Sequence, residues 1–114
     1  MEYNHLIQVT AEGMGNGEDK ELSKILLANY LSILIERGEL PKFIVFYNEG
    51  VKLLHQASSV LRVLKEVEEH DCILLACKTC LARFEMLEQI GVGKFCTMAD
   101  IVELQLCSSK VINL

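Results

Sequence analysis

The stretch FIVFYNEG, residues 43–50, decides the fold class of this 114-residue chain. Its first five residues, Phe43 to Tyr47, are aliphatic or aromatic without interruption. A strand with one face in water would alternate between apolar and polar residues, whereas a continuous run is typical of a parallel strand that is covered on both faces. The turn-forming residues Asn48, Glu49 and Gly50 follow, so we expect the strand to end there.

Short apolar runs of the same kind recur on both sides of this stretch, and helical patterns separate them. We expect strands at residues 5–9, 43–47, 72–76, 95–96 and 110–114, and helices at residues 18–36, 58–69, 81–90 and 98–107. Regular alternation of apolar strands with helices predicts an α/β protein. We therefore expect a three-layer α/β/α sandwich with a mostly parallel five-stranded sheet, in a single domain over residues 1–114.

Three of the expected helices carry recognisable signals at their ends. Gly38 is placed to close the helix at residues 18–36, and Ser58 is the expected N-cap of the helix at residues 58–69. Thr97, followed by Asp100 three residues later, resembles a capping box for the helix at residues 98–107. Apolar residues cover almost the whole circumference of the helix at residues 18–36, so we expect this helix to be buried on two sides and to form part of a subunit interface.

The composition limits the classes of partner. Hydrophobic residues make up 51% of the chain, which is high for so small a domain, and this predicts a homo-oligomer. The net charge is −5 and the basic residues are scattered, so we expect neither nucleic acid nor a membrane surface as a partner. A cytoplasmic location is expected, because the chain starts without a secretion signal and no segment approaches the roughly 18 apolar residues of a membrane span.

The five cysteines divide into two groups. An odd number without a secretion signal argues against a disulfide framework. Cys72, Cys96 and Cys107 lie in apolar segments and are expected to be small buried hydrophobic residues. The other two, Cys77 and Cys80, form a CxxC motif directly after an apolar strand and directly before a helical pattern.

That position places the CxxC motif at the edge of a parallel sheet where ligands usually bind, beyond the carboxyl ends of the strands. Near the first turn of a helix, and with Lys78 close by, the pKa of Cys80 is expected to fall so that thiolate predominates near neutral pH. The expected strand at residues 43–47 ends in Tyr47 and is followed by Asn48. Both residues are expected to face the same edge of the sheet as the CxxC motif. The candidate substrate- or partner-binding residues are therefore Lys78, Thr79, Tyr47 and Asn48.

Several chemistries could use two such thiols. Zinc requires a second pair of ligands and covalent haem requires a histidine after the motif, where Leu81 stands, so we expect no metal and no cofactor. A thioredoxin-like fold carries a proline after its CxxC, but Pro41 precedes this one. Disulfide exchange and a persulfide carrier both remain open. The loop at residues 13–17 lies among acidic residues, and we interpret it as a turn and not as a phosphate-binding loop.

Four segments of the chain resemble the DsrE/DsrF-like family, and within it most closely the YedF-type domains of selenium metabolism. These segments are GNGEDKELSKILLANYL at 15–31, LPKFIVFYNEGVKLL at 40–54, LLACKTCLARF at 74–84 and TMADIVELQLCSSKVINL at 97–114. The resemblance implies a three-layer fold and an oligomer. It also implies that Cys77 corresponds to the sulfur-carrying cysteine of the sulfur-relay members and Cys80 to the second cysteine of the YedF pattern.

From these observations we expect a sulfur-relay protein, a possible sulfurtransferase, in sulfur or selenium metabolism. Cys77 is the expected carrier of sulfane sulfur as a persulfide, and Cys80 would resolve or share that persulfide. Sulfur-donor and sulfur-acceptor proteins would be its partners. The alternative from another class is a non-catalytic oligomeric module that binds a small ligand or a protein at the same edge.

Overall fold

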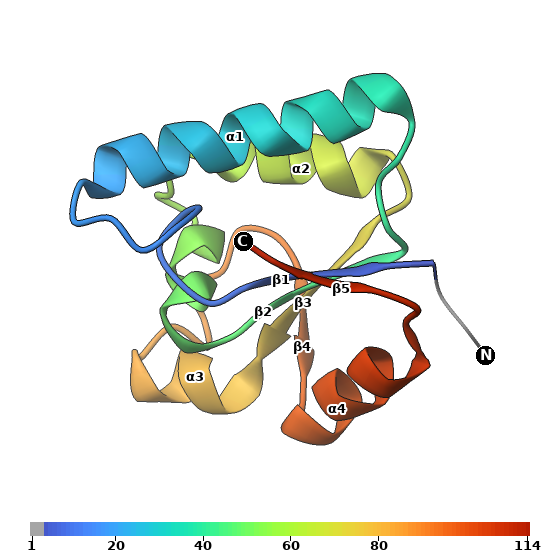
Figure 1. The fold of residues 1–114 in the computed structure, drawn as a ribbon. Helices are drawn as coiled ribbons and strands as arrows, with labels where there is room; N and C mark the ends of the chain where they lie inside the picture. Colours follow the sequence, from blue (N-terminus) through green and yellow to red (C-terminus); the bar gives the residue numbers. More distant parts are fainter. Residues whose placement is uncertain (1–3) are drawn as a thin grey trace.

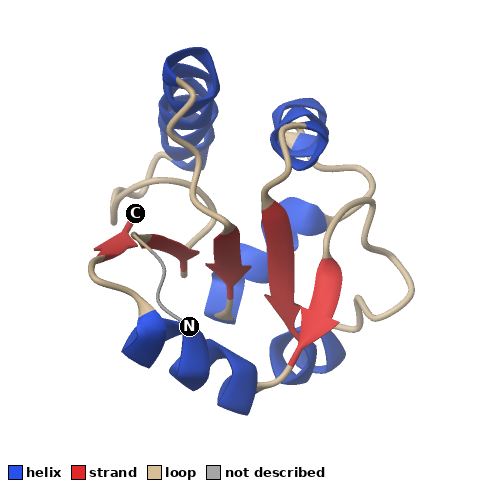
Figure 2. Cartoon of the chain, turned by 90° about the vertical axis from the view of Figure 1, so that its right-hand side faces the viewer, coloured by secondary structure: helices blue, strands red, loops and turns tan. Residues whose placement is uncertain are grey.

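The computed structural model describes residues 4–114 as three layers, with a sheet between helices (Figures 1 and 2). The strands are β1 (Leu6–Val9), β2 (Phe43–Phe46), β3 (Ile73–Cys77), β4 (Lys94–Cys96) and β5 (Val111–Asn113). The helices are α1 (Lys20–Arg37), the 3₁₀ helix η1 (Asn48–Leu54), α2 (Leu61–Glu69), α3 (Lys78–Arg83) and α4 (Met98–Cys107). The sheet order is β4-β3-β2-β1-β5 and every neighbouring pair is parallel, which confirms the predicted five-stranded sandwich.

The central strand β2 is buried on both faces, as its continuous apolar sequence predicts. Ile44 and Phe46 belong to the core that also contains Leu27 of α1. Val45 points to the opposite face and packs in a second core with Ile101 of α4. Figure 1 shows α1 and α2 on one side of the sheet and α4 on the other. Cys77 of the CxxC motif belongs to this second core, and Cys80 packs against both cores.

The structure confirms the ends of α1 to within two residues but not its burial on two sides. The Asp19 carboxylate accepts a hydrogen bond of 3.1 Å from the Leu22 amide, and Gly38 closes the helix with a left-handed φ of 65°. The side chains that point away from the sheet are 42–55% exposed; they are Leu22, Ile25, Leu26 and Ile33. Within this chain, therefore, α1 is buried on one side only.

The capping box at the start of α4 is confirmed. The Asp100 amide donates to the Thr97 hydroxyl, and the Asp100 carboxylate accepts from the Thr97 amide at 2.9 Å. The helix spans Met98–Cys107, as predicted. Two reciprocal bonds satisfy amides that the first turn of a helix would otherwise leave without a partner, and so they fix the point at which α4 begins.

Two helix predictions are wrong at their boundaries. Ser58 does not cap α2, because its hydroxyl accepts from the Val60 amide and forms a turn, and the helix begins three residues later, at Leu61. The helix expected at residues 81–90 is instead α3, which begins directly after Cys77. It ends early because Glu85 adopts a left-handed φ of 57°, which a continuous right-handed helix does not allow.

Of the cysteines that were expected to be buried, Cys72 is buried and Cys107 is not. Cys72 is buried, and burial raises the pKa of its thiol to about 12. Cys107 is only half-buried, and its thiol donates to the Glu103 carboxylate at 3.4 Å, so it is not a core residue. Across residues 4–114, the structure has no helix that is long and apolar enough to cross a membrane.

Candidate functional site

The Cys80 thiol lies in an open hollow at the carboxyl edge of the sheet. The hollow has a volume of about 290 Å³, and its lining residues are Tyr47, Asn48, Thr79, Cys80, Arg83 and Phe84. Tyr47 and Asn48 follow β2, whereas Thr79 and Cys80 lie in the first turn of α3, directly after β3. Because β2 and β3 are parallel neighbours, their carboxyl ends meet, and four of the predicted site residues come together there.

A backbone hydrogen bond holds the Cys80 thiol in this position. The Asn48 amide donates to Cys80 Sγ at 3.1 Å. Asn48 adopts a left-handed φ of 52°, a conformation that asparagine accepts more readily than most residues. This left-handed residue lies where the chain leaves β2 and begins η1.

Cys77 lies behind Cys80, in the second core of the protein. As the last residue of β3, it is 1% exposed and packs in one cluster with Ile101 and Leu104 of α4. The family resemblance implies that this residue is the sulfur carrier. In the structure Cys80, and not Cys77, contributes to the surface of the hollow. Lys78, the fifth predicted site residue, is exposed and does not line the hollow.

The electrostatics of Cys80 differ from the expectation of a low pKa. Partial burial raises the pKa of the Cys80 thiol, and a hydrogen bond with the Cys77 thiol adds to this effect. The hydrogen bond from the Asn48 amide opposes the rise, because it favours the thiolate. Since α3 has only six residues, it provides little of the stabilisation that a longer helix would give. The expectation of a lowered pKa is therefore wrong.

Sequence reasoning misses two residues of the hollow, Arg83 and Phe84. Both belong to the helical turn after Cys80, at spacings of three and four residues, which place side chains on one face of a helix. That spacing is visible in the sequence, but the helix was expected to begin only at residue 81. Arg83 provides the positive charge that was expected from Lys78.

Phe84 links the hollow to the neighbouring loop. The Lys52 ammonium lies 4.5 Å from the centroid of the Phe84 ring. The same ammonium pairs with Glu49 at 3.2 Å and with Glu12 at 3.7 Å. These contacts join η1 and the segment before the glycine loop to the end of α3, and they hold the aromatic wall in place.

The glycine loop folds back onto α1. The Met14 amide donates to the Ser23 carbonyl at 2.9 Å, and Gly13 has a φ of 143°. A Cβ atom on Gly13 would lie 2.5 Å from the Ser23 backbone, so only glycine fits this close approach. The contact supports the interpretation of this loop as a tight turn.

A third cysteine lies beside the CxxC motif. Cys96, in β4, is the direct register partner of Cys77 in β3. It is 5% exposed and belongs to the same core cluster as Cys77. Burial and the neighbouring Cys77 raise the pKa of its thiol to about 11. The expectation that Cys96 is a small buried hydrophobic residue is confirmed. Its pairing with Cys77 could not be predicted, because the pairing of two strands is a long-range property that local patterns do not reveal.

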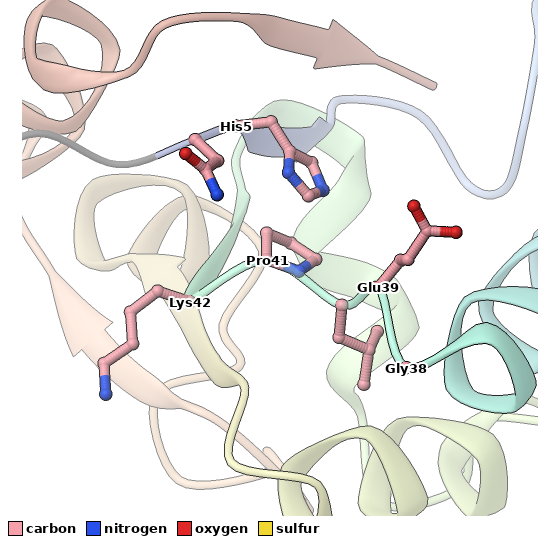
Figure 3. A pocket seen from close by; sticks show the side chains of 7 residues that line it. His5, Gly38, Glu39, Pro41 and Lys42 are labelled. Atoms are coloured by element: carbon pink, nitrogen blue, oxygen red, sulfur yellow. The ribbon is translucent and has the colours of Figure 1, made fainter.

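A larger hollow lies at the opposite edge of the sheet, among the residues that precede β1 and β2 (Figure 3). Its volume is about 580 Å³, and it is lined by His5, Glu39, Pro41 and Lys42 among others. Burial lowers the pKa of His5, and Lys110 lowers it further. In Figure 3 the Lys42 side chain extends away from the His5 ring. Neither cysteine of the CxxC motif lines this larger hollow.

Within the described part of the chain, no group of three or more His, Cys, Asp or Glu side chains is arranged to hold a metal ion. Among residues 4–114, no histidine or carboxylate completes a ligand set with Cys80 and its neighbours Cys77 and Cys96. The arrangement offers nucleophilic thiols, an amide donor and a guanidinium.

Solved structures share this fold over almost the whole chain. The ychN protein from E. coli has a TM-score of 0.73 at 14% identity, covering 97% of this chain and 99% of its own. The fold is the YchN-like, or DsrEFH-like, fold. Two further matches are proteins of unknown function. MTH1491 from Methanobacterium thermoautotrophicum has a TM-score of 0.70 at 18% identity, covering 96% of this chain and 99% of its own. BT1422 from Bacteroides thetaiotaomicron has a TM-score of 0.70 at 20% identity, covering 97% of this chain and 95% of its own.

No protein-family model and no curated protein matches the sequence. At these identities the solved structures define the fold alone, so function must be argued from the site.

Proposed function

We propose that this chain is a sulfur-relay protein that accepts sulfane sulfur on Cys80 and carries it as a persulfide. One observation carries the proposal: the Cys80 thiol lies in an open hollow and accepts a hydrogen bond from the Asn48 amide at 3.1 Å. The resemblance favours Cys77 as the carrier, but Cys77 is 1% exposed. We therefore assign the first acceptance of sulfur to Cys80.

The accepting step is a thiol exchange that needs no oxidant. The Cys80 thiolate attacks the outer sulfur of a persulfide on the donor, and the donor S–S bond breaks as a new S–S bond forms on Cys80. The donor sulfur retains the electron pair as a thiolate and takes up a proton. A volume of about 290 Å³ suits a short polysulfide or a single cysteine side chain of a partner.

Two groups stabilise the charge of the bound persulfide. The Asn48 amide already donates to Cys80 Sγ, and amide donors bind anionic acceptors more strongly than neutral ones. Arg83 lines the same hollow and contributes a positive charge. Tyr47 and Phe84 give the hollow aromatic walls.

The test is to incubate the protein with inorganic polysulfide, or with a cysteine desulfurase and cysteine, and to measure the intact mass. We expect an adduct of one or more sulfur atoms that is lost in Cys80→Ser and kept in Cys107→Ser, the matched control on α4. An adduct that survives Cys80→Ser but is lost in Cys77→Ser would assign the carrier to Cys77. Absence of any adduct would favour the non-catalytic binding module. Repeating the incubation with a selenium donor tests the link to selenium metabolism.

Disulfide exchange, the third possibility, makes a separate prediction. It requires a stable bond between Cys77 and Cys80 after mild oxidation, with a measurable potential against glutathione. Intact mass and a count of free thiols distinguish this bond from a persulfide: the disulfide consumes two thiols without adding sulfur, whereas the persulfide adds the mass of sulfur, which cyanide releases as thiocyanate.

We also propose that the chain associates with copies of itself through the outer face of α1. Leu22, Ile25, Leu26 and Ile33 are exposed there, and their spacing of three, four and seven residues places them along one stripe of the helix. A second α1 of the same sequence offers a matching stripe. Pairing the two would give this helix the burial on two sides that its sequence predicts.

A further inference from the structure

Cys96 is a buried nucleophile that the accepting step does not use, and its position next to Cys77 has a geometric basis. The two residues are partners in the register of β3 and β4. Neighbouring strands lie about 4.8 Å apart, and paired residues point to the same face of the sheet. Both side chains therefore lie side by side beneath α4, where they share a core with Ile101 and Leu104.

Cys77 is also adjacent to Cys80. It is the last residue of β3, and Cys80 lies three residues later in the first turn of α3. Cys80 packs against both core clusters, including the one that contains Cys77 and Cys96. A hydrogen bond between the thiols of Cys77 and Cys80 contributes to the raised pKa of Cys80. Cys77 is therefore the middle member of a row of three thiols.

The two ends of this row face different hollows. Cys80 lines the hollow that also contains Arg83 and Phe84. Cys96 lines a second hollow of about 250 Å³, between Leu75 of the sheet, Leu104 of α4 and Phe95. Cys77 lines neither hollow and is 1% exposed. A row of thiols thus runs from one hollow to the other through the second core.

We infer that sulfane sulfur accepted at Cys80 passes to Cys77 and then to Cys96, where the second hollow presents it to the thiol of an acceptor. This inference rests on the proposed function, since it requires Cys80 to take up sulfur first. Separate openings allow the donor to remain at the first hollow while the acceptor approaches at the second.

Each transfer balances without an external reagent. In the first step, Cys77 sulfur attacks the outer sulfur of the Cys80 persulfide; the S–S bond at Cys80 breaks and an S–S bond forms at Cys77. The proton of the attacking Cys77 thiol passes to the departing Cys80 thiolate. The second step repeats this exchange between Cys77 and Cys96. Total charge and oxidation state remain constant, which suits a buried path where a net charge would be costly.

The experiment loads the full chain with inorganic polysulfide for increasing times, traps persulfides with iodoacetamide, and locates the trapped sulfur by peptide mass spectrometry. In the wild-type chain we expect sulfur on Cys80 first and on Cys96 later. In Cys77→Ala we expect sulfur to accumulate on Cys80, because its onward path is blocked, and the sulfur on Cys96 relative to that on Cys80 to fall by at least tenfold at the same time points. Cys107→Ala is the control and should follow the wild type.

Several outcomes would overturn the inference. Sulfur on Cys80 but never on Cys96 of the wild-type chain would refute the path and leave the proposed function standing. Equal labelling of Cys96 in the wild type and in Cys77→Ala, or labelling of Cys96 that persists in Cys80→Ala, would show that Cys96 takes sulfur directly. No sulfur on Cys80 of the wild type would refute the proposed function itself. Cys77→Val, which fills the buried space better than alanine, provides a second blocked variant, and thermal melts of both check that they are folded.

Discussion

The backbone amide of Asn48 donates a hydrogen bond of 3.1 Å to Sγ of Cys80, and so joins the end of β2 to the first turn of α3. This bond orients the thiol in the hollow and favours its ionised form. Partial burial and the Cys77 thiol act in the opposite direction and raise the pKa of Cys80. The reactivity of the Cys80 thiol therefore depends on the position of the Asn48 amide.

Substitutions of Asn48 test that dependence. Because Asn48 has a φ of 52°, Asn48→Gly should retain the backbone and the rate at which iodoacetamide alkylates Cys80. Asn48→Val should cost about 1–2 kcal/mol of the free energy of unfolding, since a β-branched residue is strained in this region. The valine variant should also need a higher pH for the same alkylation rate, because a displaced amide stabilises the thiolate less. Denaturant unfolding and alkylation rates against pH measure both effects; identical profiles for the two variants would contradict the assigned role.

Arg83 should favour anionic reagents at Cys80. Replacing it with glutamine removes a positive charge from the hollow, so we expect alkylation by anionic iodoacetate to slow by about threefold relative to neutral iodoacetamide at low salt. Lys78→Gln removes the same charge from a side chain that does not line the hollow, and it should change this ratio less. An equal effect of the two substitutions would mean that only the net charge matters.

Gly50 is required for the contact between η1 and β1. A Cβ atom there would lie 2.0 Å from the Val9 carbonyl oxygen, and backbone atoms cannot yield as a flexible side chain can. Gly50→Ala should therefore lower the free energy of unfolding by about 3 kcal/mol or more. Gly17→Ala, where a Cβ would meet no atom within 4 Å, is the matched control and should be close to neutral. Thermal or denaturant unfolding of both variants measures this difference in the free energy of unfolding. Equal losses in the two variants would contradict the prediction.

Two buried thiols should make the protein less stable in alkali. Burial raises the pKa of Cys72 to about 12 and that of Cys96 to about 11 in the folded chain. An unfolded thiol loses its proton near pH 8.5, so above that pH the unfolded state binds fewer protons and becomes favoured. The contribution of these two thiols to stability should be constant below about pH 8 and then fall by up to about 1.4 kcal/mol per pH unit for each thiol, until the folded pKa is reached.

Alanine variants identify the source of this loss. Cys72→Ala and Cys96→Ala should each show a shallower decline of the free energy of unfolding between about pH 8.5 and 11, even where the substitution lowers stability at neutral pH. Urea unfolding at several pH values provides the slopes. A decline that neither variant reduces would have to come from other groups.

The outer stripe of α1 predicts an oligomer that one charge should disrupt. Leu26→Lys places an ammonium in the middle of the stripe, where Leu26 is 42% exposed in the single chain. We expect light scattering at micromolar concentration to give an oligomer for the wild type and a smaller species for the variant. Arg62→Lys, a conservative change at an exposed position of α2, should leave the mass unchanged. A monomeric wild type would contradict the proposed interface.

Local signals predicted the elements whose ends are set by neighbouring residues. The capping box of Thr97 and Asp100 fixes the start of α4, and the left-handed Gly38 fixes the end of α1. The uninterrupted apolar residues Phe43 to Phe46 predicted a strand buried on both faces, and the cores on its two sides confirm this. The edge of the sheet where Asn48 and Cys80 meet follows from the parallel order of the strands.

Features that depend on tertiary contacts could not be predicted in this way. The end of α3 depends on the left-handed conformation of Glu85. Glutamate does not favour this conformation as glycine does, so the sequence gives no signal for the end of the helix. The row of three thiols depends on the register of β3 and β4, which brings Cys96 opposite Cys77 across an intervening segment. The pKa of Cys80 depends on burial and on Cys77, and a rule based on helix ends alone gave the wrong direction.

The connection through α4 has a consequence for synthesis on the ribosome. This helix carries the chain from β4 at one edge of the sheet to β5 at the other, and its residues Ile101 and Leu104 form the cover over Cys77 and Cys96. Both cysteines leave the exit tunnel before their cover does. A nascent chain paused at this stage exposes the Cys77 thiol, which the finished protein shields, so oxidation of Cys77 should concentrate on molecules that are still being made.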